Sequence, residues 1–219
     1  MLKVNLSEKY HPDKLLKSTP FKGESKRIIA IGASTGGVDA IAKILKQLPR
    51  DLPPIIITQH IPSGFSTSFA KRLNANSEID VFEVKDRILL QNSCAYLAPG
   101  GLHLILDKQG NDYYARAQDG IRISRHCPSV DVMFRSLNNV AGRSALAIIL
   151  TGMGDDGSIG IKELYDNGAY TIAQDEESCV VFGMPKQAIA KGAICEIVGL
   201  DFIYKKIIAY ANGELKRKS

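Results

Sequence analysis

Short apolar runs, each followed by a loop and then by apolar residues at helical spacing, recur along the chain. Residues 28–31 form the first run, and Val38, Ile41 and Leu45 follow its glycine-rich loop at helical spacing. The same order begins again at residue 55 and at residue 145. Runs of this length are typical of buried strands, and strands that alternate with helices favour a parallel sheet covered by helices.

Residues 81–124 follow a different pattern, because apolar and polar positions alternate there. Turn signals lie within this stretch at residues 99–101 and 109–111, and together these features predict antiparallel hairpins. Apolar segments at 169–173 and 193–198 and a closing helix over about 200–210 complete the pattern. We therefore predict an α/β fold whose doubly wound, mostly parallel sheet is flanked by helices and carries an antiparallel hairpin portion.

The chain of 219 residues is 45% hydrophobic, which is enough for one substantial core. Residues 1–25 are polar and interrupted by prolines, and we predict a flexible leader there. Residues 26–212 are expected to form one domain. Residues 213–219 are expected to form a basic tail.

Charge and cysteine content exclude several classes of protein. The net charge of +5 comes from 28 basic and 23 acidic residues, and much of the excess lies in the two tails, so a nucleic-acid partner is not indicated. We find neither a membrane span nor a signal peptide, and expect a cytoplasmic protein. The four cysteines lie far apart without a Cys-x-x-Cys pair, which indicates reduced thiols.

The loop after the first apolar run reads Gly32-Ala33-Ser34-Thr35-Gly36-Gly37 and fits the G-x-S-x-G pattern of an exposed serine nucleophile. The same loop could cradle phosphate at a helix N-terminus, so a non-catalytic nucleotide-binding module is the alternative. For dinucleotide binding, however, Ser34 replaces the middle glycine of the fingerprint. A short-chain dehydrogenase would also need a downstream Tyr-x-x-x-Lys pair, and that spacing occurs only upstream of the loop.

Two other loops supply a base and an acid. His60 follows the second apolar run, and Asp155 and Asp156 lie among glycines after the run at 145–150. One carboxylate could orient the imidazole through its Nδ1–H, but the residues alone leave the choice between the two aspartates open. The order Ser, His, Asp differs from that of α/β-hydrolases. Nothing ties the other downstream acidic cluster, residues 175–177, to this loop, so we predict no metal.

These three loops together resemble the catalytic domain of the CheB chemotaxis methylesterases. The segments at residues 96–103, 128–134 and 173–185 fit the same family, and the resemblance extends from about residue 27 to residue 200. It implies that Ser34 is the nucleophile, His60 its general base and Asp156 the acid. It also implies that the backbone N–H groups of Met153 and Thr35 stabilise the oxyanion, and that no cofactor is used.

The resemblance implies a serine hydrolase that demethylates glutamate methyl esters on chemotaxis receptors, releases methanol and also deamidates receptor glutamines. The expected partner is the cytoplasmic helical region of these receptors, with no nucleic acid, no membrane insertion and a monomeric enzyme. Two features depart from the family. Cys127 stands where many relatives have Arg, and residues 1–25 are too few for the receiver domain that relatives usually carry, so we expect the catalytic domain without it.

Overall fold

The computed structural model of the protein describes residues 8–215 and 217. A seven-stranded sheet runs through its centre in the order β10-β9-β8-β1-β2-β5-β3, and every neighbouring pair of its strands is parallel. The strands of this sheet are β1 (Ile28–Ala33), β2 (Ile55–Gln59), β3 (Asp80–Glu83), β5 (Cys94–Leu97), β8 (Ala145–Ile149), β9 (Tyr170–Gln174) and β10 (Glu196–Val198). The central strands are fully buried, as their uninterrupted apolar runs predicted.

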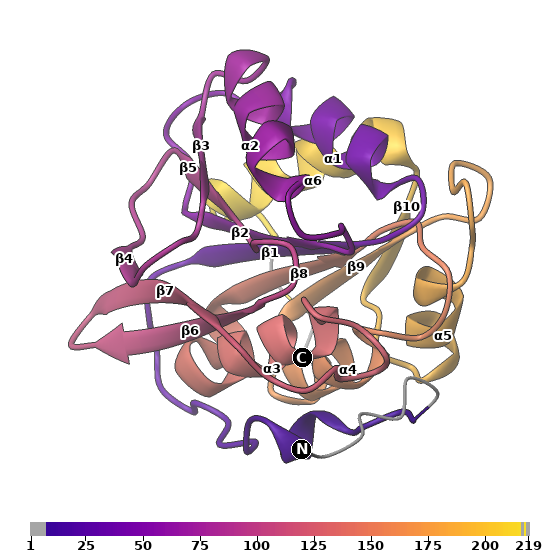
Figure 1. Ribbon diagram of the computed structural model, residues 1–219. Coiled ribbons are helices and arrows are strands. Elements are labelled where there is room, and N and C mark those ends of the chain that lie inside the picture. The colour runs from indigo at the N-terminus through magenta and orange to yellow at the C-terminus, as the bar shows by residue number, and fades with distance from the viewer. Residues whose placement is uncertain (1–7, 216, 218–219) are drawn as a thin grey trace.

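Helices cover both faces of the sheet (Figure 1), which confirms the predicted doubly wound α/β fold. One face carries α1 (Gly37–Leu45), α2 (Ser66–Ala75) and α6 (Leu200–Ala211). The other carries α3 (Val130–Val140), α4 (Ser158–Asp166) and α5 (Met184–Ala190). Two short 3₁₀ helices, η1 (Pro12–Lys14) and η2 (Gly142–Ser144), complete the helical elements of the described residues.

The alternating stretch at residues 81–124 divides between two sheets. An antiparallel hairpin of β6 (His103–Gln109) and β7 (Asp112–Gln118), joined by β4 (Ile88–Leu89), confirms the predicted hairpin portion. The prediction of hairpins for the whole stretch is wrong, because β3 and β5 pair in parallel at one edge of the main sheet. β5 is buried along its whole length and β3 alternates because it is the edge strand, so local pattern did not reveal their shared sheet.

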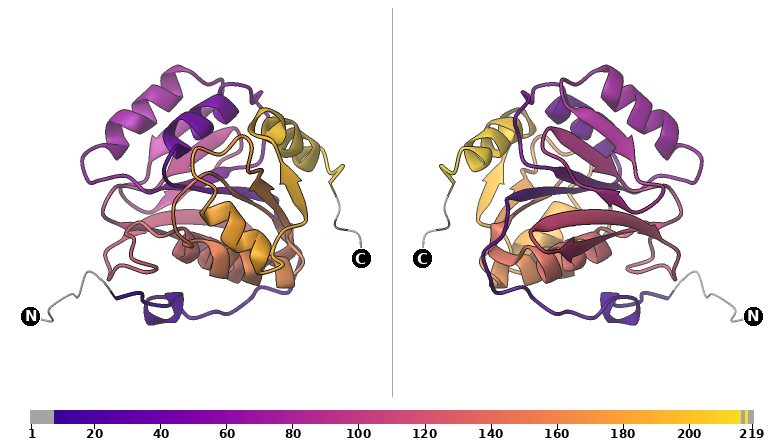
Figure 2. Two further views of the ribbon diagram at one scale, coloured as in Figure 1. Left: turned by 90° about the vertical axis from the view of Figure 1, so that its right-hand side faces the viewer. Right: turned by 90° about the vertical axis from the view of Figure 1, so that its left-hand side faces the viewer.

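Residues 8–25 lie along the outer side of α3 and α4, at the bottom of both views in Figure 2. Pro12 is buried there, and Asp13 pairs with the buried guanidinium of Arg135 in α3. Residues 1–7 of the predicted leader lie outside the described residues, as do 216, 218 and 219 of the predicted tail. The flexibility of the leader and the basic tail as a separate segment stay predictions.

None of the helices in the described part of the chain is both long and apolar enough to cross a membrane. All four cysteines are free thiols, and Cys94 is buried.

Candidate active site

Three loops meet at the carboxyl ends of the central strands β8, β1 and β2, which are neighbours in the sheet. Ser34 follows β1, His60 follows β2, and Asp156 lies in the loop after β8. From β1 the chain continues to β2, which is one neighbour of β1 in the sheet. It later returns to β8, which is the neighbour of β1 on the opposite flank. Ligand sites of open α/β sheets lie at such a reversal of strand order, outside the carboxyl ends of the strands.

The structure brings Ser34, His60 and Asp156 into one hydrogen-bonded chain. The Nδ1 atom of His60 lies 3.0 Å from the Oγ atom of Ser34. Its Nε2 atom lies 2.7 Å from the Oδ2 atom of Asp156. Asp156 is fully buried, His60 is nearly so, and Ser34 is partly exposed, so the chain runs from the interior to the surface. This arrangement suits a hydroxyl nucleophile, a base and an acid that orients the base.

The orientation of the imidazole is the reverse of the one predicted, because Nε2 and not Nδ1 faces the carboxylate. The strand order gives the reason. Ser34 follows β1, the neighbour of the strand β2 that precedes His60, whereas Asp156 follows β8, one strand farther away. The ring nitrogen nearer the backbone of His60 therefore meets the nearer loop, and the outer nitrogen meets the farther loop. The proton that orients the ring lies on Nε2 in this arrangement.

Asp156 accepts hydrogen bonds from four donors. Besides His60, these are the Oγ of Ser129 at 2.8 Å and the backbone N–H groups of Val130 at 2.7 Å and Asp131 at 3.0 Å. Val130 and Asp131 begin α3, so the carboxylate lies at the positive end of a helix. Burial acts to raise the pKa of Asp156, but His60 and the backbone donors outweigh burial and hold this pKa below its ordinary value.

Ser129 has two roles in this contact, since its hydroxyl also caps α3 by accepting from the N–H of Val132. Replacing Ser129 by Ala should therefore cost about 1 kcal/mol of unfolding free energy for the lost cap. It should also lower kcat for a reaction at Ser34 by about tenfold, because a buried carboxylate loses one donor. Ser136→Ala is the matched control, since that buried hydroxyl of α3 bonds only backbone groups. Equal kcat losses in the two variants would contradict the proposed contact.

Side chains and glycines hold the two loops that flank Ser34. The amide of Gln59 donates to the carbonyl of Ser34 at 2.8 Å and to that of His60 at 3.0 Å. The N–H of Ser34 donates to the carbonyl of Thr151 at 3.0 Å. A Cβ atom on Gly152 would lie 2.7 Å from the Cβ of Ser34, so only glycine allows this close approach of the two loops.

Thr35 and Met153, the residues predicted to stabilise an oxyanion, lie on these two apposed loops. Thr35 directly follows Ser34, and its carbonyl accepts from the Thr151 hydroxyl at 2.9 Å. Met153 directly follows Gly152 and its side chain is 69% exposed. Within the described residues neither backbone N–H donates a hydrogen bond. Both donors are therefore available to a ligand beside Ser34, and their role in stabilising an oxyanion stays a prediction.

A second histidine, His126, packs against the imidazole of His60. The ring of His126 stacks on that of His60, with 3.6 Å between the ring centroids and 9° between the planes. Burial and the nearby charge of His60 lower the pKa of His126 to about 4, so it is neutral near pH 7. A flat neutral ring restricts the rotation of His60 without competing for Ser34 or Asp156.

Asp131 is a second buried carboxylate close to Asp156. It accepts from the hydroxyl of Ser124 at 2.8 Å and from the N–H groups of Ile159 and Gly160, both at 2.9 Å, at the start of α4. Burial, together with the negative charge of Asp156, raises the pKa of Asp131 to about 7. Asp131 thus joins α3 to α4 beside the site and carries a proton at mildly acidic pH.

The raised pKa of Asp131 predicts a pH-dependent stability. Between the ordinary carboxyl pKa of 3.8 and about pH 7, the folded state holds a proton that the unfolded state has released. The contribution of Asp131 to stability is therefore present at low pH and lost as pH rises through about 7. In the Asp131→Asn variant, the side-chain carbonyl can still accept from the N–H groups of Ile159 and Gly160. We expect the thermal midpoint of this variant, relative to that of wild type, to be higher at about pH 8 than at about pH 5. A difference between the two thermal midpoints that stays constant with pH would contradict the raised pKa of Asp131.

Two other residues singled out in the sequence lie at the border of the site. Asp155 pairs with the ammonium of Lys9 and makes no hydrogen bond to His60 within the described residues. Cys127 contacts the carbonyl of Gly101 through its Sγ at 3.1 Å, and burial raises the pKa of this thiol to about 11. Cys127 is therefore a neutral thiol and supplies no charge in place of the family's Arg.

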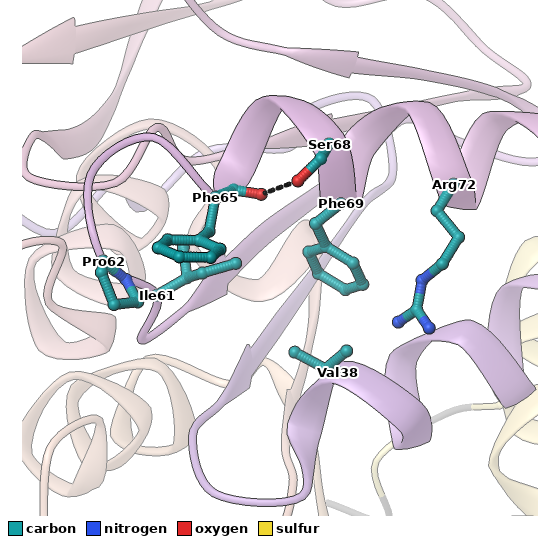
Figure 3. Close-up of a pocket in the computed structure, with 7 residues that line it drawn as sticks. All are labelled: Val38, Ile61, Pro62, Phe65, Ser68, Phe69 and Arg72. Atoms are coloured by element: carbon teal, nitrogen blue, oxygen red, sulfur yellow. Dashed lines mark hydrogen bonds between the residues drawn. The ribbon is translucent and has the colours of Figure 1, made fainter.

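An open apolar groove of about 440 Å³ borders the site. It lies between α1 and α2 and begins at Ile61 and Pro62, directly after His60 (Figure 3). Phe65 and Phe69 of the α2 side point into it, as does Val38 of α1 (Figure 3). An extended apolar surface thus begins at the residue that follows His60.

Sequence reasoning missed Ser129, Gln59, His126 and Asp131 as site residues. Ser129 stands directly before α3, and Asp131 lies in its first turn. Serine is a preferred residue at the N-cap of a helix, and this was the one local signal that could have suggested a role for Ser129. No local signal indicates that Gln59 bridges two loops or that His126 stacks on His60, because both contacts join segments far apart in the chain.

Comparisons with known proteins place the chain in one family. The family model described as CheB methylesterase matches residues 29–207. A protein-glutamate methylesterase/protein-glutamine glutaminase of Pectobacterium atrosepticum is 49% identical over 198 residues, which cover 90% of this chain and 56% of that protein. One of the same name, numbered 2, from Chromobacterium violaceum is 53% identical over 183 residues, 84% of this chain and 51% of that protein. The chain thus spans about half the length of these relatives.

The fold is similar to a solved structure, the CheB methylesterase catalytic domain of Thermotoga maritima. The TM-score is 0.81 at 37% sequence identity, and the match covers 84% of this chain and 98% of that one. These comparisons give no support to the alternative of a nucleotide-binding module.

Proposed function

Because the chain belongs to the CheB methylesterase family, we propose that it is a serine hydrolase that removes methyl groups from glutamate methyl esters of chemotaxis receptors. The single observation that carries this proposal is the hydrogen-bonded chain from the Ser34 hydroxyl through His60 to the buried Asp156. A hydroxyl that is hydrogen-bonded to a base, which in turn is hydrogen-bonded to a desolvated carboxylate, suits acyl transfer.

In the first half of the reaction, Nδ1 of His60 takes the proton of Ser34 as the Ser34 Oγ attacks the carbonyl carbon of the methyl ester. Asp156 stabilises the imidazolium through Nε2–H. The N–H groups of Thr35 and Met153 stabilise the negative oxygen of the tetrahedral intermediate. The His60 proton then passes to the methoxy oxygen, methanol leaves, and a glutamyl ester of Ser34 remains.

In the second half, His60 takes a proton from water, and the hydroxide oxygen attacks the same carbonyl carbon. The bond to Ser34 breaks, His60 returns its proton to Ser34, and the receptor glutamate leaves as a carboxylate. The same steps on a glutamine side chain release ammonia in place of methanol. We therefore propose that the enzyme also deamidates receptor glutamines.

The proposed partner is the cytoplasmic helical region of methyl-accepting receptors, and the proposed location is the cytoplasm. We propose that residues 26–212 form the catalytic domain and that it acts as a monomer without a cofactor. In support of one unit, the two apolar layers of the sheet include residues from Ile28 to Tyr210.

Methanol release from receptor membranes that carry labelled methyl groups tests the proposed function. The purified chain should release methanol, and the Ser34→Ala variant should not. No release by the wild-type chain, with receptors shown to be methylated, would overturn the proposal.

A further inference from the structure

A tight turn beside the active site holds two residues in a backbone conformation that favours glycine. Ile123 and His126 exchange backbone hydrogen bonds of 3.0 and 2.8 Å across the turn. Between them, Ser124 and Arg125 have φ angles of 49° and 71°. Turns with two positive φ angles usually contain Asn-Gly, and a long side chain such as that of Arg125 is strained there.

Buried contacts force the chain into this turn. The Ser124 hydroxyl donates to the fully buried carboxyl group of Asp131 at 2.8 Å, and the Ser124 N–H donates to the carbonyl of Tyr10 at 3.0 Å. Asp131 in turn is fixed by the start of α4. Strained backbone persists where surrounding structure determines it, and such positions gather at functional sites.

The turn lies directly against the reacting groups. His126, its last residue, stacks on His60 at 3.6 Å, and Arg125 is the residue before it. Arg122 stands at the other end of the turn, and both arginines are exposed. Among residues 8–215 and 217, neither guanidinium has an ion-pair partner or a side-chain hydrogen bond. Both positive charges contribute to the lowered pKa of His126, after burial and His60.

We propose that Arg122 and Arg125 bind a carboxylate that flanks the scissile ester, so that the enzyme favours methylated glutamates beside acidic side chains of a receptor helix. This inference rests on the proposed function. Guanidinium groups bind carboxylates through paired N–H donors. The two on this turn have no partner among the described residues and stand next to the histidine that stacks on His60, so they match an acidic peptide. Each hydrolysis creates a carboxylate, so removal of one methyl group makes a neighbouring methylated site a better substrate.

Two helical peptides test the proposal. Each carries one glutamyl γ-methyl ester, and they differ only in having Glu or Gln one helical turn to either side. Wild type should hydrolyse the acidic peptide with a kcat/KM about fivefold higher, and the preference should shrink at high salt. In the double variant Arg122→Gln and Arg125→Gln the ratio should fall to about 1. Arg50→Gln is the control and should keep the preference, because Arg50 is an exposed arginine before the amino end of β2, whereas the site lies at the carboxyl end.

Arg125→Gly separates recognition from folding. Glycine adopts the positive φ without strain, so the thermal midpoint should not fall, while the preference for the acidic peptide should weaken. The ratio of the two kcat/KM values does not depend on the fraction of folded enzyme. An unchanged ratio in the double glutamine variant, or equal hydrolysis of both peptides by wild type, overturns this inference and leaves the esterase intact. Hydrolysis of neither peptide would count against the proposed function itself.

Discussion

Replacing Ser34 by Ala is expected to lower kcat for ester hydrolysis by about 10⁴- to 10⁶-fold. The reason is that the lost oxygen is the one 3.0 Å from Nδ1 of His60, and a water molecule cannot form the covalent intermediate in its place. The backbone bond from Ser34 to Thr151 does not involve the hydroxyl and should keep the loop in place. The thermal midpoint should therefore remain near that of wild type.

Hydrolysis of a glutamyl methyl ester peptide, followed by methanol release, measures this effect. Ser63→Ala is the matched control, because Ser63 is an exposed serine in the loop directly after His60 and makes no side-chain hydrogen bond within the described residues. Its kcat should stay within about twofold of wild type, as expected for a surface substitution. A Ser34→Ala variant with more than about one-tenth of wild-type kcat would rule out Ser34 as the nucleophile.

Replacing Asp156 by Asn is expected to lower kcat by about 10⁴-fold. The amide cannot stabilise the imidazolium as a carboxylate does. It also has no orientation that suits its neighbours, because both oxygens of Asp156 accept from rigid donors, Oδ2 from the N–H of Val130 and Oδ1 from that of Asp131. Either placement of the NH₂ group faces a backbone N–H, so the variant should also lose about 1–3 kcal/mol of unfolding free energy.

The neighbouring residue provides the control. Asp155→Asn removes a carboxylate that pairs with Lys9 and does not contact His60, so its kcat should change by less than about threefold. The measurement is kcat for both variants at one pH, together with their thermal midpoints. A larger loss of kcat in Asp155→Asn than in Asp156→Asn would reverse the assignment of the acid.

The elements with the clearest hydrophobic patterns were predictable, and so was the meeting of their loops. The buried runs of β1, β2 and β8 are uninterrupted, and parallel strands bring their carboxyl ends to one edge. α3 was not predicted as a helix, although its polar residues Asp131, Arg135 and Asn138 recur at helical spacing and could have indicated one. The parallel pairing of β3 with β5 was not predicted, because it joins two segments that are separated in the sequence.

Within the site, residue types on the three loops pointed to Ser34 and His60, and the resemblance to the family selected Asp156 over Asp155. The sequence could not predict which nitrogen of His60 meets which partner, because that depends on the strand order. The four bonds to Asp156 and the stacked His126 likewise arise from the docking of α3 and of the turn before it. Such contacts follow from the assembled fold.

The most direct test of Ser34 as the nucleophile is to trap the acyl group on the enzyme. A peptide with a glutamyl γ-p-nitrophenyl ester has a good leaving group, so acylation should outpace deacylation and the covalent intermediate should accumulate. The enzyme is quenched with acid in the first turnover, digested and analysed by mass spectrometry. We expect one glutamyl peptide attached to Ser34. Turnover without this adduct, or an adduct on another residue, would contradict this role of Ser34.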